Sequence, residues 1–440
     1  MCSMLVRLFA ENYGPFREGF DLSMEALNLT AEGDRGFFEM PVRGEEQPIR
    51  LLRMAAIYGP NASGKSSIIR AADALFALAI DSGPRSKEDD PLEMYDPFGL
   101  DPACRNQPCT LGCEVVVDGE DGRDAEIVRY EISFDGVRVH SEAATAIHGD
   151  HADLLFRRDG DSMEFSERVD PHLSVPLGEV TRSNASILSV ASQLKQEPLL
   201  PLYRAIRNAV RTINCSTDHH GVMSYTLRQL QRQPGFKSWV MQRLLRPADV
   251  GVVGIDVQEV DPKLVEDELL QFARKRMPAS MDPDALRFVE PVLTHKGPDD
   301  EVKLDFEQES SGTQKLLALA GPWFDVIRKG YCVFVDELSA SLHPALLMSL
   351  LEAFNAPRSS PRAQIVFTVH DTTLLEGVLR RDQVFFTEKN DEGVSTLFPL
   401  SDFRERQNGV HNLRKRYLEG RYGGVPRGLD FGSLFEVDPD

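Results

Sequence analysis

A glycine-rich loop between two apolar segments restricts the fold of this chain more than any other feature. Residues 59–66 read GPNASGKS and fit the pattern G-x-x-x-x-G-K-[ST]. The apolar segment 51–58 before the loop predicts a strand, and apolar residues recur at helical spacing from Ile68 to Ala79 after it. A complete pattern in a strand–loop–helix context disfavours a chance glycine-rich turn. It predicts an α/β fold of the P-loop class.

The residue types in this loop are suited to hold phosphate. Glycines let backbone N–H groups turn inward around phosphate oxygens, and the helix that follows adds the positive end of its dipole. Lys65 can reach the β- and γ-phosphates of a nucleotide, and the Ser66 hydroxyl can ligate Mg²⁺. We therefore expect ATP and Mg²⁺ as ligands. The predicted nucleotide-binding residues in this part of the chain are Gly59, Pro60, Asn61, Ala62, Ser63, Gly64, Lys65, Ser66 and Ser67.

A second segment supplies the acidic groups that hydrolysis would need. Residues 331–335 predict a buried strand, and Asp336 and Glu337 follow it directly. Asp336 is expected to hold Mg²⁺, and Glu337 to polarise the attacking water. Two adjacent acids at a strand end can also be a solvated turn. The complete phosphate loop earlier in the chain favours the catalytic interpretation.

Two further segments resemble motifs of ABC-type ATPases. ESSGTQKLLALA, residues 309–320, resembles their signature motif in a variant form, with Ser310, Ser311 and Gly312 at the start of a predicted helix. FTVHD carries His370, which resembles the switch histidine that senses the γ-phosphate. A Ser-Ser-Gly is often only a helix cap, and a lone histidine is often a core residue. The order of the motifs along the chain favours the ATPase interpretation.

The resemblance also implies pairing of two copies. In ABC-type ATPases the signature helix contacts the nucleotide held by a partner chain. Ser311 and Gly312 would then close on the nucleotide bound to Lys65 of a second copy, with residues 339–343 along the same interface. ATP would join the two copies, and hydrolysis would release them.

The chain as a whole resembles a family of bacterial ATPases. DELSASLHP and VHDTTLLE, residues 336–344 and 369–376, resemble the RecF, SMC and overcoming-lysogenisation-defect ATPases. Other segments resemble the stand-alone AAA/ABC-like ATPases of restriction-linked and abortive-infection loci: SNASILSVASQ, ADVGVVGIDV, RRDQVFFTEKNDEGVSTLFPLSDF and YLEGRYGGVP. The resemblance implies ATP hydrolysis, defence against phage and a separate effector nuclease as partner. The chain ends about seventy residues after His370, which we expect is too soon for a fused Toprim nuclease.

The same resemblance, together with local patterns, predicts a domain order. We expect an ABC-type ATPase head in two halves, residues 1–95 and 301–428, with two lobes inserted between them. A β-rich insertion is predicted over 96–183, with hairpins around 112–134 and 154–166. A helical lobe is predicted over 184–300, and an acidic tail over 429–440.

Charge limits what the chain can bind. It carries 69 acidic and 49 basic residues, a formal net charge of −20, so it has no general attraction for nucleic acid. Contact with DNA or RNA would need a local basic face. The helical segment could supply one, or its arginines could form a solvated face: Arg204, Arg207, Arg211, Arg228, Arg232, Arg243 and Arg246. A second basic cluster could dock a partner or pair with the acidic surface: Arg404, Arg406, Arg414, Lys415, Arg416 and Arg421.

Composition predicts a cytoplasmic protein. Six cysteines without regular spacing fit a reducing compartment, and the chain has no signal peptide and no apolar run long enough to span a membrane. Three cysteines and three histidines are spaced too loosely for a typical zinc site: Cys104, Cys109, Cys113, His140, His148 and His151. Gln193 is a candidate for a glutamine that contacts metal or water at the nucleotide.

Three hypotheses for function stay open on the sequence alone. The first is an ATPase that senses infection and regulates an effector. The second is a DNA-repair ATPase that acts directly on nucleic acid. The third is a scaffold that binds nucleotide with little turnover.

Overall fold

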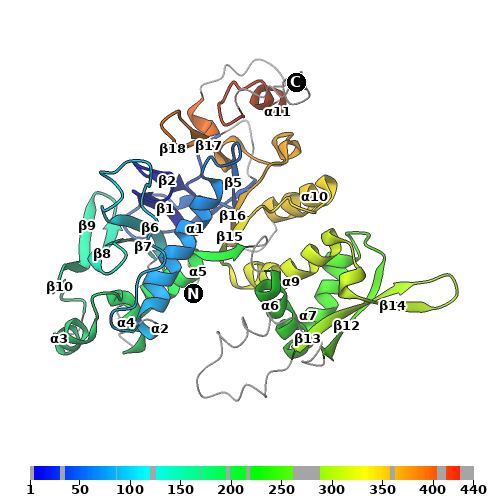
Figure 1. Cartoon of the computed structure of the whole chain (residues 1–440), viewed down its shortest axis with the longest axis horizontal. Coiled ribbons are helices and arrows are strands. Elements are labelled where there is room, and N and C mark those ends of the chain that lie inside the picture. The colour runs from blue at the N-terminus through cyan, green and yellow to red at the C-terminus, as the bar shows by residue number, and fades with distance from the viewer. Residues whose placement is uncertain are drawn as a thin grey trace, which may run out of the picture. The chain divides into compact units, whose positions relative to one another are not determined.

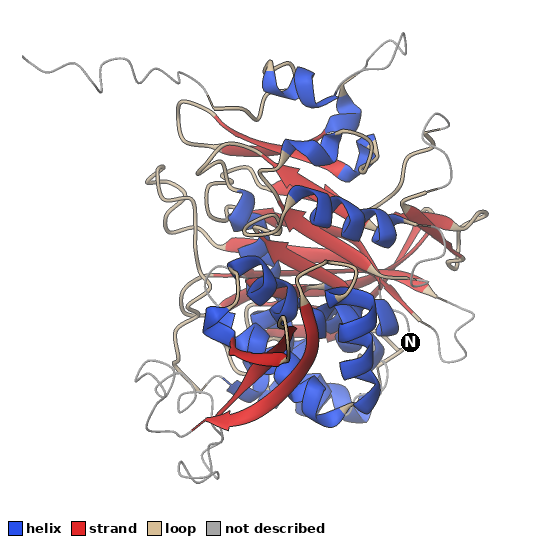
Figure 2. Cartoon of the chain, turned by 90° about the vertical axis from the view of Figure 1, so that its right-hand side faces the viewer, coloured by secondary structure: helices blue, strands red, loops and turns tan. Residues whose placement is uncertain are grey.

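The computed structural model describes residues 4–29, 35–85, 87–118, 125–169, 171–194, 199–214, 219–260, 288–356, 362–403 and 413–426 (Figure 1). The chain contains both helices and strands, and one of its sheets has a parallel core, so the expected α/β class is confirmed (Figure 2). The chain divides into two compact units. The first unit comprises Met1–Thr212, Lys329–Asp336 and Leu351–Asp440, and the second comprises Ile213–Arg328 and Glu337–Leu350.

The first unit contains a seven-stranded antiparallel sheet. Its strand order is β10-β9-β8-β7-β6-β1-β2. The strands are β1 (Met4–Glu11), β2 (Phe20–Ser23), β6 (Cys109–Val117), β7 (Glu126–Phe134), β8 (Val139–His148), β9 (His151–Asp159) and β10 (Ser162–Phe165). Both predicted hairpins, β6–β7 and β9–β10, are confirmed. The predicted turn over 119–124 lies outside the described residues. The strands of the β-rich segment do not form a sheet of their own, because β6 pairs with β1.

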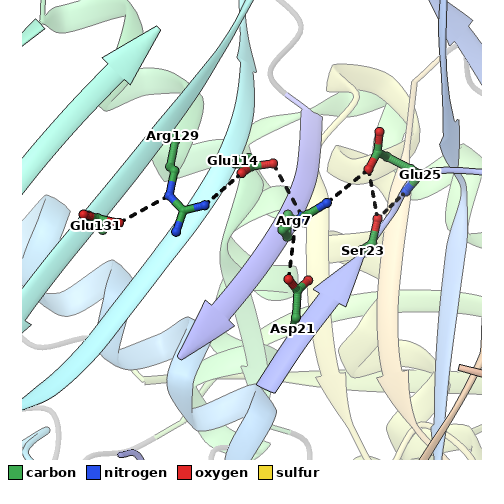
Figure 3. A network of polar contacts seen from close by, with 7 residues as sticks. All are labelled: Arg7, Asp21, Ser23, Glu25, Glu114, Arg129 and Glu131. Carbon is green, nitrogen blue, oxygen red and sulfur yellow. Dashed lines mark hydrogen bonds and ion pairs between the residues drawn. The ribbon is translucent and has the colours of Figure 1, made fainter. Parts of the chain in front are cut away.

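Charged side chains connect four neighbouring strands on one face of this sheet (Figure 3). Arg7 on β1 lies 3.3 Å from the Asp21 carboxylate, 3.4 Å from Glu25 and 3.5 Å from Glu114. Arg129 on β7 continues the network to Glu114 at 3.4 Å. Exposed ion pairs contribute little stability one by one. Pairs across strands do favour one register, because a shift by one residue would separate every partner.

The second sheet of the chain carries the glycine-rich loop. Its order is β11-β15-β16-β5-β17-β18, and β15, β16, β5 and β17 run parallel. The strands are β5 (Met54–Tyr58), β11 (Arg211–Asn214), β15 (Cys332–Asp336), β16 (Gln364–Thr368), β17 (Val384–Lys389) and β18 (Ser395–Pro399). Every residue of β5, β15 and β16 is buried, as expected for parallel strands covered on both faces. The strands predicted at 51–58 and 331–335 are confirmed.

Helix α1 (Lys65–Phe76) joins the two sheets into one core. It contacts β15 and β16 of the parallel sheet and β6 of the antiparallel sheet. Ile68, Ala72 and Leu75 lie on its buried face. The helix continues through a π-helical turn, η2 (Ala77–Asp81), into α2 (Ser82–Arg85). The predicted helix after the loop is therefore confirmed.

Shorter elements complete the first unit. They are β3 (Phe37–Met40), β4 (Ile49–Leu52), α3 (Pro171–Val180), α4 (Ile187–Gln193), α5 (Leu200–Ala209), η7 (Thr372–Leu375), η8 (Arg381–Gln383), η9 (Leu400–Asp402) and α11 (Leu413–Leu418). Helix α10 (Pro344–Asn355) begins in the second unit and ends in the first.

The second unit combines helices with a three-stranded antiparallel sheet. Its elements are α6 (His219–Arg232), α7 (Pro234–Trp239), η3 (Val240–Leu245), β12 (Val252–Val260), β13 (Phe288–Lys296), β14 (Glu301–Asp305), η6 (Phe306–Gln308) and α9 (Ser311–Lys329). Helices are present between residues 184 and 246, but β11, β12 and β13 also lie in the segment that we expected to be helical. The periodicity of helix and strand is hard to separate in short, half-polar segments. Residues 261–287 of the predicted helical lobe lie outside the described residues.

Close approach of two helices organises this unit. A Cβ at Gly321 on α9 would lie 2.7 Å from the Thr226 hydroxyl on α6, so glycine is required there. The same hydroxyl donates to the Ala318 carbonyl at 2.7 Å. Phe236, Trp239 and Phe324 form an aromatic cluster beside this contact. Within the described ranges, none of the helices combines the length and the apolar character needed to span a membrane.

Candidate functional site

The glycine-rich loop lies at the carboxyl end of β5, and α1 begins at Lys65. Gly64, the N-cap, has φ 105°, a conformation that favours glycine, and a Cβ there would lie 2.9 Å from the Phe16 ring. A Cβ at Gly59 would lie 2.2 Å from the Thr387 hydroxyl. Both glycines of the motif are therefore required by their surroundings. The first N–H groups of α1 point toward the loop, where a phosphate could accept from them.

Lys65 lies across this loop. Its ammonium nitrogen donates to the carbonyl oxygens of Gly59 and Pro60, at 2.8 Å each. The residue is only 7% exposed, so its charge is held close to the backbone of the loop. A phosphate group bound by the loop would therefore lie close to the positive charge of Lys65.

A buried carboxylate lies at the ends of the neighbouring parallel strands. Asp336, the last residue of β15, is 7% exposed, and its Oδ1 accepts from the Thr368 hydroxyl at 2.5 Å. Thr368 ends β16, which pairs with β5 in register with Ile57. Carboxyl ends of parallel strands meet at one edge of a sheet, where ligands of such folds bind. Thr368 fixes one carboxylate oxygen, and this residue was missed in the sequence because nothing local marks it.

Strand β17 borders the loop on the other side of β5. The hydroxyls of Thr387 and Ser63 lie 2.6 Å apart, and the Thr387 hydroxyl also lies 3.2 Å from the Tyr58 carbonyl, to which it donates. Ser63 donates to the Pro60 carbonyl at 2.8 Å. The loop is thus fixed to the rest of the sheet through side chains far apart in the sequence.

A cavity of about 400 Å³ opens at the loop. Its size suits a nucleotide-sized ligand. Its lining is Gly14, Pro15, Ala62, Gly64, Lys65, Ser66, Ser67, Arg70, Asp96 and Lys389. Three cations and one carboxylate line it, so it is basic although the chain carries a net charge of −20. The structure brings together five of the predicted residues, Ala62, Gly64, Lys65, Ser66 and Ser67. Half of the lining was not predicted.

The unpredicted residues reach the cavity through long-range contacts. The Gly14 N–H donates to the Asp96 carbonyl at 2.6 Å, and a Cβ at Gly14 would lie 3.3 Å from that of Ser67. Arg70 donates to the Ser67 hydroxyl at 2.8 Å and lies 3.5 Å from the Asp96 carboxylate. No local pattern could reveal these contacts.

The residues at this end of the sheet suit Mg²⁺ bound together with phosphate. Hydroxyl and carboxylate oxygens are hard donors, and Mg²⁺ is typically held by one or two carboxylates plus substrate phosphates. Ser66 lines the cavity, and Asp336 keeps a buried carboxylate at the neighbouring strand end. Their donor chemistry therefore fits the predicted metal.

The other predicted site residues lie outside this cavity. His370, two residues after Thr368, is exposed. Glu337 belongs to the second unit, as do Ser310, Ser311 and Gly312. Ser310 caps α9, since its hydroxyl accepts from the Thr313 N–H at 3.1 Å. The cap interpretation therefore holds for Ser310, while Ser311 is exposed.

Within the second unit, the start of α9 lies against the segment after Asp336. A Cβ at Gly312 would lie 2.7 Å from the Ser341 carbonyl oxygen, so only glycine allows this approach. Lys315 donates to the Glu337 carbonyl at 2.6 Å. Glu337 and Ser341 have φ 51° and 64°, a strained conformation for residues with a side chain. Strain of this kind is frequent in functional segments.

Gln193 and the cysteines were weaker candidates for site residues. Gln193 lies beside Gly83, where a Cβ would meet its amide nitrogen at 2.5 Å. Gly83 is about 27 Å along the continuous helix from Lys65 at 1.5 Å per residue, so Gln193 is not at the loop and that prediction was wrong. Cys104, Cys109 and Cys113 are free thiols. In the part of the chain that the structure describes, no three His, Cys, Asp or Glu side chains are arranged to hold a metal ion.

The predicted basic surfaces are divided. Arg204, Arg207 and Arg211 lie in the first unit, and the remaining four arginines of the helical segment lie in the second. In the C-terminal cluster Arg414 pairs with Glu376 at 3.2 Å, and Arg421 with Glu419 at 2.9 Å. Arg404 and Arg406 lie outside the described residues.

Comparison with known proteins agrees with the predicted resemblance. Residues 225–376 match a family described as "AAA domain, putative AbiEii toxin, Type IV TA system". The predicted resemblance to AAA/ABC-like ATPases is thereby confirmed. The match covers about a third of the chain and includes the segments around Gly312, Asp336 and His370. No curated protein is similar enough in sequence to be matched to this chain.

Three solved structures are distantly similar over 90% of the chain. The Smc head bound to the C-winged helix domain of ScpA is 12% identical, with 97% of that chain covered and a TM-score of 0.46. The SMC head domain from Thermotoga maritima is 11% identical, with 98% covered and a TM-score of 0.38. An Smc head domain with an extended coiled coil, bound to the C-terminal domain of ScpA and derived from Pyrococcus furiosus, is 13% identical, with 96% covered and a TM-score of 0.41.

Proposed function

We propose that this chain binds ATP with Mg²⁺ at the glycine-rich loop and hydrolyses it. The observation that carries the proposal is the basic cavity around Lys65, Ser66 and Ser67, at the end of a sheet where Asp336 is buried and oriented. Lys65 and the N–H groups of the loop would bind the phosphates. Ser66 and Asp336 would hold Mg²⁺, which neutralises phosphate charge when bound.

The hydrolytic step is assigned to the residues that follow the strands. Glu337 accepts a hydrogen bond from the attacking water and orients it toward the γ-phosphorus. The water oxygen forms a bond to that phosphorus as the bond to the β–γ bridging oxygen breaks, one proton of the water is released to solvent, and ADP and phosphate leave. His370 contacts the γ-phosphate and senses its presence. Ser310, Ser311 and Gly312 of a second copy complete the site, so that ATP joins two copies.

The biological role that we propose is sensing and regulation in a bacterial anti-phage system, in the cytoplasm, with a separate effector nuclease. The name of the matching family, with its putative abortive-infection toxin, supports this role. Direct action on DNA or RNA has less support, because part of the C-terminal basic cluster is paired with carboxylates. A scaffold that binds nucleotide would differ from an ATPase in its low rate of ATP hydrolysis.

The test of the core proposal measures binding and hydrolysis separately. The full chain is titrated with ATP in a calorimeter, and phosphate release is followed with Mg²⁺. We expect binding and turnover in the wild type, loss of both in Lys65→Ala, and binding without turnover in Glu337→Gln. Lys87→Gln, an exposed lysine on a loop, is the matched control. Retained binding by Lys65→Ala would refute the assignment of the loop, and full function of Glu337→Gln in cells would favour the scaffold.

The test of the anti-phage role uses the neighbouring gene. Its product is co-purified with the chain in the presence and in the absence of ATP. We expect capture that depends on nucleotide. An unchanged ATPase rate on addition of DNA or RNA would argue against the repair hypothesis, whereas strong stimulation would favour it.

A further inference from the structure

Strand β17 approaches the glycine-rich loop closely enough to contribute to it. A Cβ at Gly59 would lie 2.2 Å from the Thr387 hydroxyl and 2.6 Å from the Thr387 carbonyl oxygen. The hydroxyls of Thr387 and Ser63 lie 2.6 Å apart. The side chain of Thr387 therefore faces the loop, and the end of β17 lies directly beside it.

Strand geometry places Lys389 on the same face as Thr387. Side chains two residues apart in a strand point the same way, about 7 Å apart along the strand. Lys389 accordingly lines the cavity together with Lys65 and Ser66. The residue between them faces elsewhere, since a Cβ at Gly423 would lie 2.5 Å from the Glu388 carboxylate.

The position of Lys389 is fixed from a second direction. Lys389 pairs with Ser395 on β18, and the Ser395 N–H donates to the Pro15 carbonyl at 2.8 Å. Pro15 is itself part of the cavity lining. The ammonium group thus extends from a rigid ladder rather than from a free loop.

Lys389 differs from the other two cations in the cavity in the contacts that its side chain makes. Lys65 is held by two loop carbonyls, and Arg70 is engaged by Asp96 and Ser67. Among the residues that the structure describes, Lys389 forms no ion pair. Its charge is therefore available to a ligand, in a chain whose overall charge would repel one.

We propose that Lys389 is a second phosphate-binding cation, which contacts the phosphate chain of the nucleotide held by the loop. The assignment rests on the proposed nucleotide-binding function and adds a residue outside the loop motif to it. The phosphate chain would then be held between a cation from the start of α1 and a cation from the end of β17. Asp336 and Thr368 end strands on the other side of β5, so Lys389 and Asp336 belong to strands on opposite sides of β5.

The experiment measures affinity by titration calorimetry for ATP and for inorganic tripolyphosphate, which has no nucleoside. We expect Lys389→Gln to weaken the binding of both ligands about tenfold, the effect of losing one charge-assisted hydrogen bond. Lys389→Arg should retain most of the affinity, and Lys87→Gln should bind both ligands as the wild type does. The melting temperature without ligand should be the same in all variants.

The outcomes separate this proposal from the proposed function. If Lys389→Gln binds both ligands normally while Lys65→Ala does not, the role of Lys389 is refuted and the loop assignment stands. If the wild type binds neither ligand, the proposed function itself fails. Should Lys389→Gln melt early, Lys389→Met keeps the aliphatic stem and removes the charge. Normal affinity of a folded Lys389→Met variant would equally refute the proposal.

Discussion

Asp336 is oriented by the side chain of Thr368. The Thr368 hydroxyl donates to Oδ1 at 2.5 Å at the end of the sheet, where both residues are buried. Groups that orient metal ligands in this way are themselves important for metal affinity. Thr368 should therefore act through Asp336 as a positioning residue.

We predict that Thr368→Val raises the Mg²⁺ concentration for half-maximal ATP hydrolysis about tenfold. Binding of ATP without Mg²⁺ should be unchanged, because Thr368 does not line the cavity. The measurement is the rate of phosphate release against Mg²⁺ concentration. Thr368→Ser keeps the hydroxyl and should restore the wild-type curve. An unaltered Mg²⁺ dependence in Thr368→Val would contradict the role.

Gly64 offers a test of the backbone of the loop. Its φ of 105° opposes a side chain, and so does the Phe16 ring, which would lie 2.9 Å from a Cβ at this position. We predict that Gly64→Ala lowers the free energy of unfolding by about 1–3 kcal/mol and weakens ATP binding. Gly99→Ala is the matched control, because a Cβ at Gly99 would meet nothing within 4 Å. Equal melting temperatures of the two variants would speak against strain at Gly64.

Site residues can be recognised from the sequence where they belong to a local motif. Lys65 and Ser66 are recognisable because the loop is continuous. Thr368 and Lys389 are not, because each enters the site from a strand that joins β5 only in the folded sheet. The Ser310 hydroxyl caps α9 in the structure, and its contact with nucleotide stays a prediction.

Among the elements, the β8–β9 hairpin is joined to α4 by a buried carboxylate. Glu142 is 1% exposed and accepts from the Ile187 N–H at 2.7 Å, the Leu188 N–H at 3.3 Å and the Tyr130 hydroxyl at 2.9 Å. These donors anchor the first turn of α4 to the antiparallel sheet. Burial raises the pKa of Glu142 above its usual value, although the donors and Arg158 act in the opposite direction.

This raised pKa predicts a pH dependence of stability. The folded chain holds the Glu142 proton at higher pH than the unfolded chain, so this group stabilises the fold less as pH rises above the unfolded pKa of about 4.5. In Glu142→Gln the contribution is absent. The free energy of unfolding of the wild type, relative to this variant, should therefore fall from pH 4.5 upward. Denaturant titrations at several pH values measure the difference, and parallel curves for the two proteins would refute the prediction.

Elements formed by neighbouring segments were predictable, whereas their partners in the sheets were not. The β6–β7 and β9–β10 hairpins follow from alternating apolar residues with a turn between them. The pairing of β6 with β1 joins segments about a hundred residues apart, and no local pattern encodes it. The expected separate β lobe is for this reason a continuation of the sheet that begins with β1.

At the scale of the whole molecule, the proposed site residues are divided between the two units. The phosphate loop and Asp336 belong to the first unit, and the start of α9 with Glu337 belongs to the second. The predicted domain boundaries remain a proposal at this scale, because the sequence indicates insertions only through resemblance.

We predict that Glu337→Gln accumulates as a dimer when ATP and Mg²⁺ are present, because bound ATP is not consumed. Light scattering coupled to size-exclusion chromatography gives the mass. Adding Ser311→Arg should return the protein to the monomer, since Ser311 is exposed and its replacement leaves the fold intact. A Glu337→Gln protein that stays monomeric at saturating ATP would refute pairing through the nucleotide.

The contact between Ser63 and Thr387 joins residues 324 positions apart. During synthesis at about 5–20 residues per second, the loop leaves the ribosome long before the strand that borders it exists. The nascent chain must therefore keep the segment around Tyr58 and Ile68 protected for some tens of seconds without its final neighbours. The loop can therefore make its contact with β17 only after residue 387 has been synthesised.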